Sequence, residues 1–376
     1  MDHLARAAAA LRVLALGAAL GAAPSHAAAQ ASLIVQGVAD AELWVTDSGS
    51  VLLTRNNGRP AALGRIHVWA ATELSSRLLV YAAGTLEGGK GRSEPGTEWY
   101  TDIIGLRYVR SEALVIDAGK LPHPVGEFAS RRYSTRNPLI GAPDAYPVGY
   151  PLGAQLSGTR GRVDYRAALV SMPVYHEDYV PDPTASARPA VGVGLTFAPG
   201  VRVGASATWG PYLNCDLPQT LLAGRSWRRY SQRVGTVDAQ VSRGYLEVRA
   251  ELGATRYDVP AGAGARPNVV RALAYYGEAK YTLTPRLFVA ARVERNNYAY
   301  IQPVSDVAWV ANPTDMYNVE VGAGYRLGAQ TLIKASVRGD TWRVPPAMRT
   351  FLPNGAAFAM QLSRAFDVFE ASRSPR

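Results

Sequence analysis

Short turns and long polar connections alternate along this chain, and runs of about ten residues with β character lie between them. The tight turns occur at residues 74–77, 110–113, 158–161, 198–200, 242–244, 284–286 and 327–329. The long connections lie near residues 46–64, 88–98, 120–151, 172–189, 210–230, 258–269, 300–315 and 343–356. A soluble β-sandwich has no reason for such asymmetry, whereas a transmembrane barrel has short turns on one side of the membrane and long loops on the other. A strand at each end of the chain and a pair at each turn predict an all-β, antiparallel transmembrane barrel of about 16 strands.

Alternation with a period of two supports this interpretation. Residues 317–327 place Tyr, Val, Ala and Leu at odd positions, and Asn, Glu, Gly and Arg at even positions. The same split occurs in 162–170, 191–197, 245–257 and 332–341. One such strand also fits the solvated face of a soluble sheet, but its repetition favours a barrel with one face in lipid and the other in water.

The first 29 residues have the features of a secretory signal peptide. Arg6 and Arg12 are basic, residues 11–20 form a short apolar core, and Ala27–Ala29 provide a small-residue cleavage site. The alternative, a membrane anchor, needs a longer apolar core. We therefore expect residues 1–29 to be removed and residues 30–376 to form a single barrel domain. After residue 30 no run approaches the roughly 18–20 apolar residues of a membrane helix, which leaves the closed barrel for an exported membrane protein.

Aromatic residues gather near the ends of the expected strands, where amphipathic rings form girdles at headgroup level in membrane barrels. The candidates for such girdles are Trp44, Trp69, Tyr81, Trp99, Tyr108, Trp209, Tyr257, Tyr281, Tyr325 and Trp342. Ordinary β propensity is the competing explanation for the same residues.

The last expected strand, 357–369, is amphipathic and reaches an aromatic at Phe369. It resembles the C-terminal signature of bacterial outer-membrane barrels, and the whole plan resembles that of a porin. Residues 118–126 (Ala-Gly-Lys-Leu-Pro-His-Pro-Val-Gly) are similar to the strand exit of phosphate-selective and related porins. The resemblance implies an outer-membrane location, passive diffusion of small hydrophilic solutes, a homotrimer, and a third loop at 120–151 that folds into the lumen.

Basic residues on that loop and on the expected lumen face are the candidates for selecting solutes, because rings of Arg and Lys favour anions. The loop contributes Lys120, Arg131, Arg132 and Arg136. The strands contribute Arg107, Arg162, Arg166, Arg249, Arg292, Lys334 and Arg338. We expect a modest preference for anionic solutes. Alternatively, the loop arginines are exposed and contact phosphates of lipopolysaccharide or other outer-membrane lipids.

Composition and motifs limit which other functions, such as catalysis or metal binding, this chain can have. A single cysteine, Cys215, allows no intrachain disulfide, and no histidine pair has the spacing of metal ligands. We therefore expect no cofactor, no metal and no catalytic residue, and the expected export leads us to expect no nucleic-acid partner despite the net charge of +10. Two alternatives stay open: a plugged, binding or structural barrel and, less favoured, an outer-membrane hydrolase.

Overall fold

The computed structural model describes residues 33–47, 58–89, 96–127, 133–143, 149–172, 186–212, 226–259, 268–305, 308–346, 349–350 and 353–370. The predicted signal peptide, Arg131 and Arg132 lie outside these ranges. Among the described residues, no helix combines the length and the apolar character that crossing a membrane requires.

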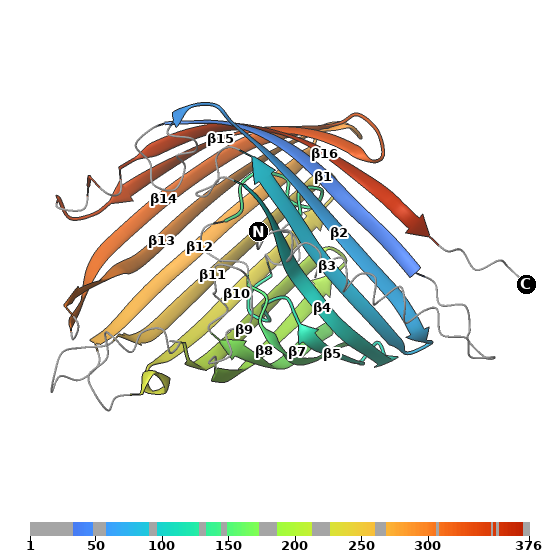
Figure 1. The fold of residues 1–376 in the computed structure, drawn as a ribbon, viewed down its shortest axis with the longest axis horizontal. Coiled ribbons are helices and arrows are strands. Elements are labelled where there is room, and N and C mark those ends of the chain that lie inside the picture. Colours follow the sequence, from blue (N-terminus) through green and yellow to red (C-terminus); the bar gives the residue numbers. More distant parts are fainter. Residues whose placement is uncertain are drawn as a thin grey trace, which may run out of the picture.

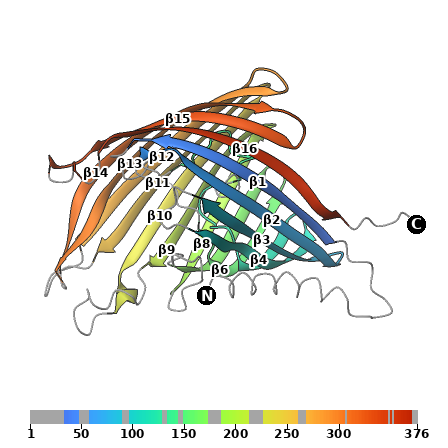
Figure 2. The same cartoon turned by 45° about the horizontal axis from the view of Figure 1, so that its top comes forward.

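Sixteen antiparallel strands form one closed barrel, as the sequence predicted (Figures 1 and 2). Each strand pairs with its neighbours in sequence, and the last pairs with the first through partners such as Leu43 and Met360. Closure leaves no sheet edge, so every strand finds hydrogen-bonding partners on both sides. The strands are β1 (Leu33–Thr46), β2 (Ala61–Ser75), β3 (Leu78–Gly89), β4 (Thr97–Ser111), β5 (Leu114–Lys120), β6 (Leu152–Arg160), β7 (Val163–Met172), β8 (Ser186–Ala198), β9 (Val201–Pro211), β10 (Ser231–Arg243), β11 (Leu246–Val259), β12 (Asn268–Thr282), β13 (Leu287–Ser305), β14 (Ala308–Arg326), β15 (Thr331–Arg343) and β16 (Gly355–Glu370).

All seven predicted turns join paired strands, but one predicted long connection is wrong. Residues 300–315 are not a loop, because β13 and β14 continue as a paired ladder that includes Ile301 opposite Ala311. The hairpin closes between Ser305 and Ala308. The aromatic and β-branched residues of this stretch favour extended backbone, and the ladder satisfies its backbone hydrogen bonds.

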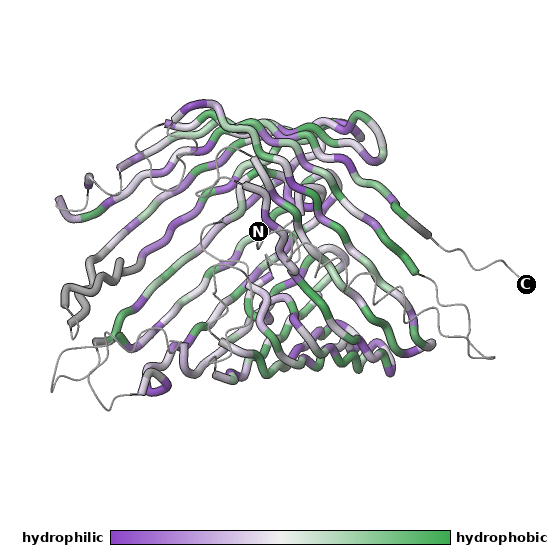
Figure 3. Tube along the Cα trace, in the orientation of Figure 1, coloured by the Kyte–Doolittle hydropathy of each residue, from purple (hydrophilic) through white to green (hydrophobic). Residues whose placement is uncertain are grey.

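Hydrophilic and hydrophobic residues alternate along the strands (Figure 3), and the two faces of the barrel differ as this alternation predicted. In β15, Lys334, Ser336 and Arg338 are buried inside, whereas Val337 between them is 51% exposed on the outside. The outward side chains are apolar along most of the wall, and the inward ones are polar or charged. This is the arrangement of a barrel whose outer face meets lipid and whose inner face is polar.

The predicted aromatic girdles are only partly present. Tyr108, Trp209, Tyr281 and Tyr325 are exposed large side chains, as a girdle requires. Six of the predicted residues do not belong to this exposed group, because Trp44 and Trp342 are buried and Trp69, Tyr81, Trp99 and Tyr257 are half-buried. The aromatic residues do occur near strand ends. Successive side chains of a strand point to opposite faces, however, so the odd or even position of each residue decides whether it faces out or in.

Candidate pore constriction

The connection between β5 and β6 enters the barrel at Lys120 and leaves it at Leu152. Gly119 has φ +138°, and a side chain there would collide with the carbonyl oxygen of Ile104 on β4. The Lys120 ammonium is buried and donates to the Thr101 carbonyl. The connection also closes on itself, since the Leu121 amide donates to the Pro151 carbonyl at 2.9 Å. The Gly-Lys pair thus lies where the chain leaves the wall at the end of β5.

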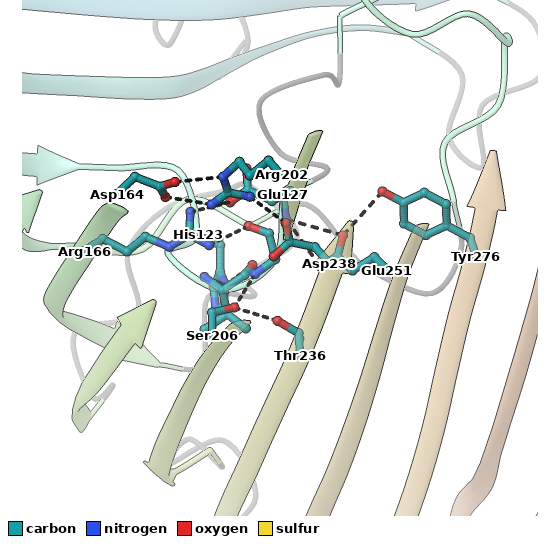
Figure 4. Close-up of polar contacts among 12 residues, drawn as sticks. His123, Glu127, Asp164, Arg166, Arg202, Ser206, Thr236, Asp238, Glu251 and Tyr276 are labelled. Atoms are coloured by element: carbon teal, nitrogen blue, oxygen red, sulfur yellow. Dashed lines mark hydrogen bonds and ion pairs between the residues drawn. The ribbon is translucent and has the colours of Figure 1, made fainter. Parts of the chain in front are cut away.

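The first docking region of the loop is residues 123–127, which contact β7, β9 and β11 (Figure 4). The Gly126 amide donates to Ser206 Oγ at 3.0 Å, and the Gly126 carbonyl accepts from Arg166 Nη2 at 3.1 Å. The Glu127 amide donates to both carboxylate oxygens of Glu251 at 3.3 Å. Wall side chains therefore satisfy the backbone groups of this loop segment.

Charged side chains surround the same region. Glu127 forms ion pairs with Arg166 (3.0 Å) and Arg202 (3.6 Å). Arg202 also holds Asp164 through Nε and Nη2, and reaches Asp238 at 2.6 Å. One loop carboxylate is thereby joined to a four-residue ion network on β7, β9 and β10 (Figure 4).

The second docking region is residues 133–141, and Lys334 on β15 is its main anchor. The fully buried Lys334 ammonium donates to three loop carbonyls, those of Ser134 (2.9 Å), Asn137 (3.0 Å) and Leu139 (2.9 Å). An ammonium carries three donors, so these bonds use all of them.

Glu320 on β14 and Arg292 on β13 bind the end of the same segment. Glu320 Oε1 accepts from the amides of Ile140 (3.2 Å) and Gly141 (3.1 Å). Arg292 Nη2 donates to the Gly141 carbonyl at 2.6 Å. Arg292 is completely buried and pairs with Glu278, Glu294 and Glu320. Its charge is balanced by carboxylates on the wall.

The β1–β2 wall completes the second region. Ser134 Oγ donates to Asp40 Oδ1 at 2.6 Å, and the Tyr133 ring makes edge contacts with His67 and Trp69 at 5.1 and 4.6 Å between ring centroids. His67 Nδ1 lies 2.8 Å from Thr85 Oγ1. In the strand order, β9 and β1 are half a ring apart. Contacts of the two docking regions therefore reach strands on opposite sides of the barrel interior.

His123 is a buried titratable group of the first docking region and lies outside the strands. Its Nδ1 accepts from the Val125 amide at 3.2 Å. Burial lowers the pKa of His123 to about 4; the contact with the Val125 backbone opposes this shift, and the weaker effect of the positive charges of Arg188 and Arg166 adds to it. The docked loop therefore holds a neutral imidazole.

The predicted selecting residues occupy three kinds of position. Arg292, Lys334 and Arg338 are buried in the wall network, and Lys120 is buried where the loop begins. Arg166, Arg249 and Arg107 remain partly open, with side chains 23%, 25% and 46% exposed. Arg136 is exposed on the loop, and Arg162 is exposed at the β6–β7 turn, where it donates to the Phe197 carbonyl. Nothing is described for Arg131 and Arg132, which fall between the two docking regions in sequence.

Sequence reasoning missed Asp40, His67 and Arg188. The first two follow the alternation of β1 and β2, so extending that analysis to residues 33–75 would have found them. Arg188 precedes Pro189 at the start of β8 and is fully buried. Its Nη1 donates to Gln232, whereas its Nε and Nη2 have no hydrogen-bond partner among the described residues. In Arg202 and Arg107, by contrast, the Nε and Nη2 atoms donate hydrogen bonds to carboxylates.

No protein-family model and no curated protein matches the sequence. Among solved structures, the chain is similar to in-vitro folded OmpT, an outer membrane protein of Vibrio cholerae. The TM-score is 0.59 at 11% identity, covering 92% of this chain and 100% of that one. It is also similar to Salmonella typhi OmpF in a complex with daunomycin, with TM-score 0.59 at 12% identity, over 89% of this chain and 97% of that one. At these identities the likeness establishes a shared fold, that of outer-membrane barrel proteins.

Proposed function

We propose that this chain is an outer-membrane porin, a passive diffusion channel for small hydrophilic solutes with a modest preference for anions. The observation that carries the proposal is the docking of residues 123–127 and 133–141, which charged wall residues on opposite sides of the barrel hold in a polar interior. Sixteen-stranded barrels are wide enough to leave an aqueous channel, and an inward loop narrows such a channel without closing the barrel itself. The fold shared with outer-membrane proteins supports the location.

The partly exposed interior arginines support the anion preference. Arg107, Arg166 and Arg249 keep accessible surface inside the barrel, whereas the buried Arg292 is balanced by three carboxylates. Interior carboxylates such as Glu247 are accessible as well, so the field across the lumen is mixed and the preference is small.

We further propose that the barrel assembles as a homotrimer and has no enzymatic activity. One similar structure, OmpT of Vibrio cholerae, is described in a trimer form. The Ser134 hydroxyl donates to Asp40, and His67 contacts Thr85, so we assign these side chains to loop docking. Hydrolysis of ester or peptide substrates by the purified barrel, lost in His67→Ala, would contradict that assignment.

Planar-bilayer recording in a KCl gradient tests the channel and its selectivity together. We expect conductance and a reversal potential on the anion-selective side. Arg249→Gln should move the reversal potential toward cation selectivity, because it removes one accessible interior charge. Arg243→Gln, at the exposed turn of the same hairpin, is the matched control and should leave it unchanged. A folded barrel that passes no ions would favour a plugged barrel, and cation selectivity of the wild type would end the anion proposal.

A further inference from the structure

Three arginines lie side by side on the outer face of the barrel, near the long-connection end of three successive strands. Arg233 on β10 is the register partner of Arg256 on β11, which is the register partner of Arg271 on β12. All three are exposed, on the same face as Val237 and Leu252. Side chains directly opposite each other on neighbouring strands have Cβ atoms about 5 Å apart, so three like charges in one row repel each other.

No described residue pairs with this row of arginines. Arg233, Arg256 and Arg271 have no hydrogen-bond or ion-pair partner within the part of the chain that the structure describes. Asp258, two positions beyond Arg256, instead accepts hydrogen bonds from Ser231, with 2.9 Å to its hydroxyl and 3.4 Å to its amide. In the same wall, by contrast, Arg295 is paired with Asp315 at 2.9 Å.

A groove of about 520 Å³ lies against these arginines, and its other lining is mainly small or apolar. The next outward positions are Gly235, Ala254 and Leu273, which are again direct register partners. A Cβ atom on Gly235 would meet no atom within 4 Å, so the glycine leaves open space on the surface. The surface is therefore cationic at one end and apolar toward the middle of the barrel.

The row also lies at the level of an exposed aromatic. Trp209 on β9 is the register partner of Arg233 and is exposed on the outer face. Exposed tryptophans mark the headgroup level of membrane proteins. An occupant of this groove thus meets cations at headgroup level and apolar surface at the depth of acyl chains.

We propose that the groove binds a phosphorylated glycolipid of the outer leaflet, an inference that depends on the proposed membrane location. Its phosphate would bridge the guanidinium groups of Arg233, Arg256 and Arg271, which match phosphate oxygens with paired donors. An acyl chain would lie over Gly235, Ala254 and Leu273. The phosphate supplies a counter-charge that the described residues do not provide, and the acyl chain covers the open apolar surface.

The test is native mass spectrometry of the detergent-solubilised full barrel titrated with bis-phosphorylated lipid A. The variant R233Q/R256Q/R271Q should bind the lipid at least tenfold more weakly than the wild type. The matched control R243Q/R286Q/R326Q removes the same charge from exposed residues at the short-turn end and should bind like the wild type. G235L fills the groove at constant charge and should also weaken binding at least tenfold. The heat-dependent mobility shift of folded barrels in gels confirms that each variant is folded.

Two further arms separate the sources of phosphate. Dephosphorylated lipid A should bind the wild type at least tenfold more weakly, and inorganic phosphate at equal concentration should not displace the phosphorylated lipid. Equal binding by the wild type and the arginine triple variant, or full displacement by inorganic phosphate, would overturn the proposal. A barrel that binds the lipid but conducts no ions would contradict the proposed channel function and leave this inference in place.

Discussion

Lys334→Met should release the second docking region of the loop and widen the channel. Methionine keeps the approximate length of the side chain but removes the charge and the three donors to the carbonyls of Ser134, Asn137 and Leu139. A hydrogen bond to a charged group contributes about 1.5–3 kcal/mol. The three bonds share one ammonium and are not additive, so we take about 3 kcal/mol for the set. The docking equilibrium of residues 133–141 then weakens about a hundredfold.

Single-channel recording measures this change directly. Lys334→Met should show larger or fluctuating conductance, because the released segment no longer holds its position across the lumen. Lys280→Met is the matched control: Lys280 is an interior lysine on β12 that pairs with Glu247 at 2.8 Å. Equal, stable conductance in the wild type and both variants, all shown to be folded, would refute the assignment of Lys334 as the loop anchor.

Two other predictions concern the first docking region. Gly126→Ala should displace the loop and alter conductance, since Gly126 has φ +80° and a Cβ there would collide with Glu251, whereas Gly161→Ala at an open turn (φ +63°) should not. Unchanged conductance in Gly126→Ala would show that the loop accommodates the side chain. Acidification should weaken docking: the pKa of His123 falls from 6.5 to about 4 when docked, so the released loop binds the proton more readily. Docking is strongest above about pH 6.5 and loses up to tenfold per pH unit toward pH 4. Conductance noise should grow between pH 6.5 and pH 4 in the wild type but not in His123→Asn. Equal pH profiles of the two proteins would contradict the assignment of this pH dependence to His123.

Much of the wall could be predicted because its signals are local. Alternation in 332–341 assigned Lys334 and Arg338 to the inner face, and the structure confirms it. The ladder of β13 and β14 through 300–315 was missed, because its pairing depends on two segments meeting rather than on either segment alone. Trp44 and Trp342 were placed in a girdle from their position near strand ends, but their parity places them inside.

The candidate site was less predictable from sequence. The residues that hold the loop were recognised in part as interior charges, but their partners were not. Lys334 binds a carbonyl 200 residues away in the chain, and Glu320 binds an amide 180 residues away. Arg292 was expected to select anions, yet it is buried among three carboxylates. Whether a charge meets solute or protein depends on contacts between distant segments.

The sequence by itself determined that this chain forms a closed antiparallel barrel with a polar interior, because turn lengths and the two-residue period of strands are properties of neighbouring residues. The tertiary structure alone decided where the third connection docks, which interior charges it covers, and that three arginines of separate strands form one row outside. These features arise from register and loop path, which bring together residues that no local pattern relates.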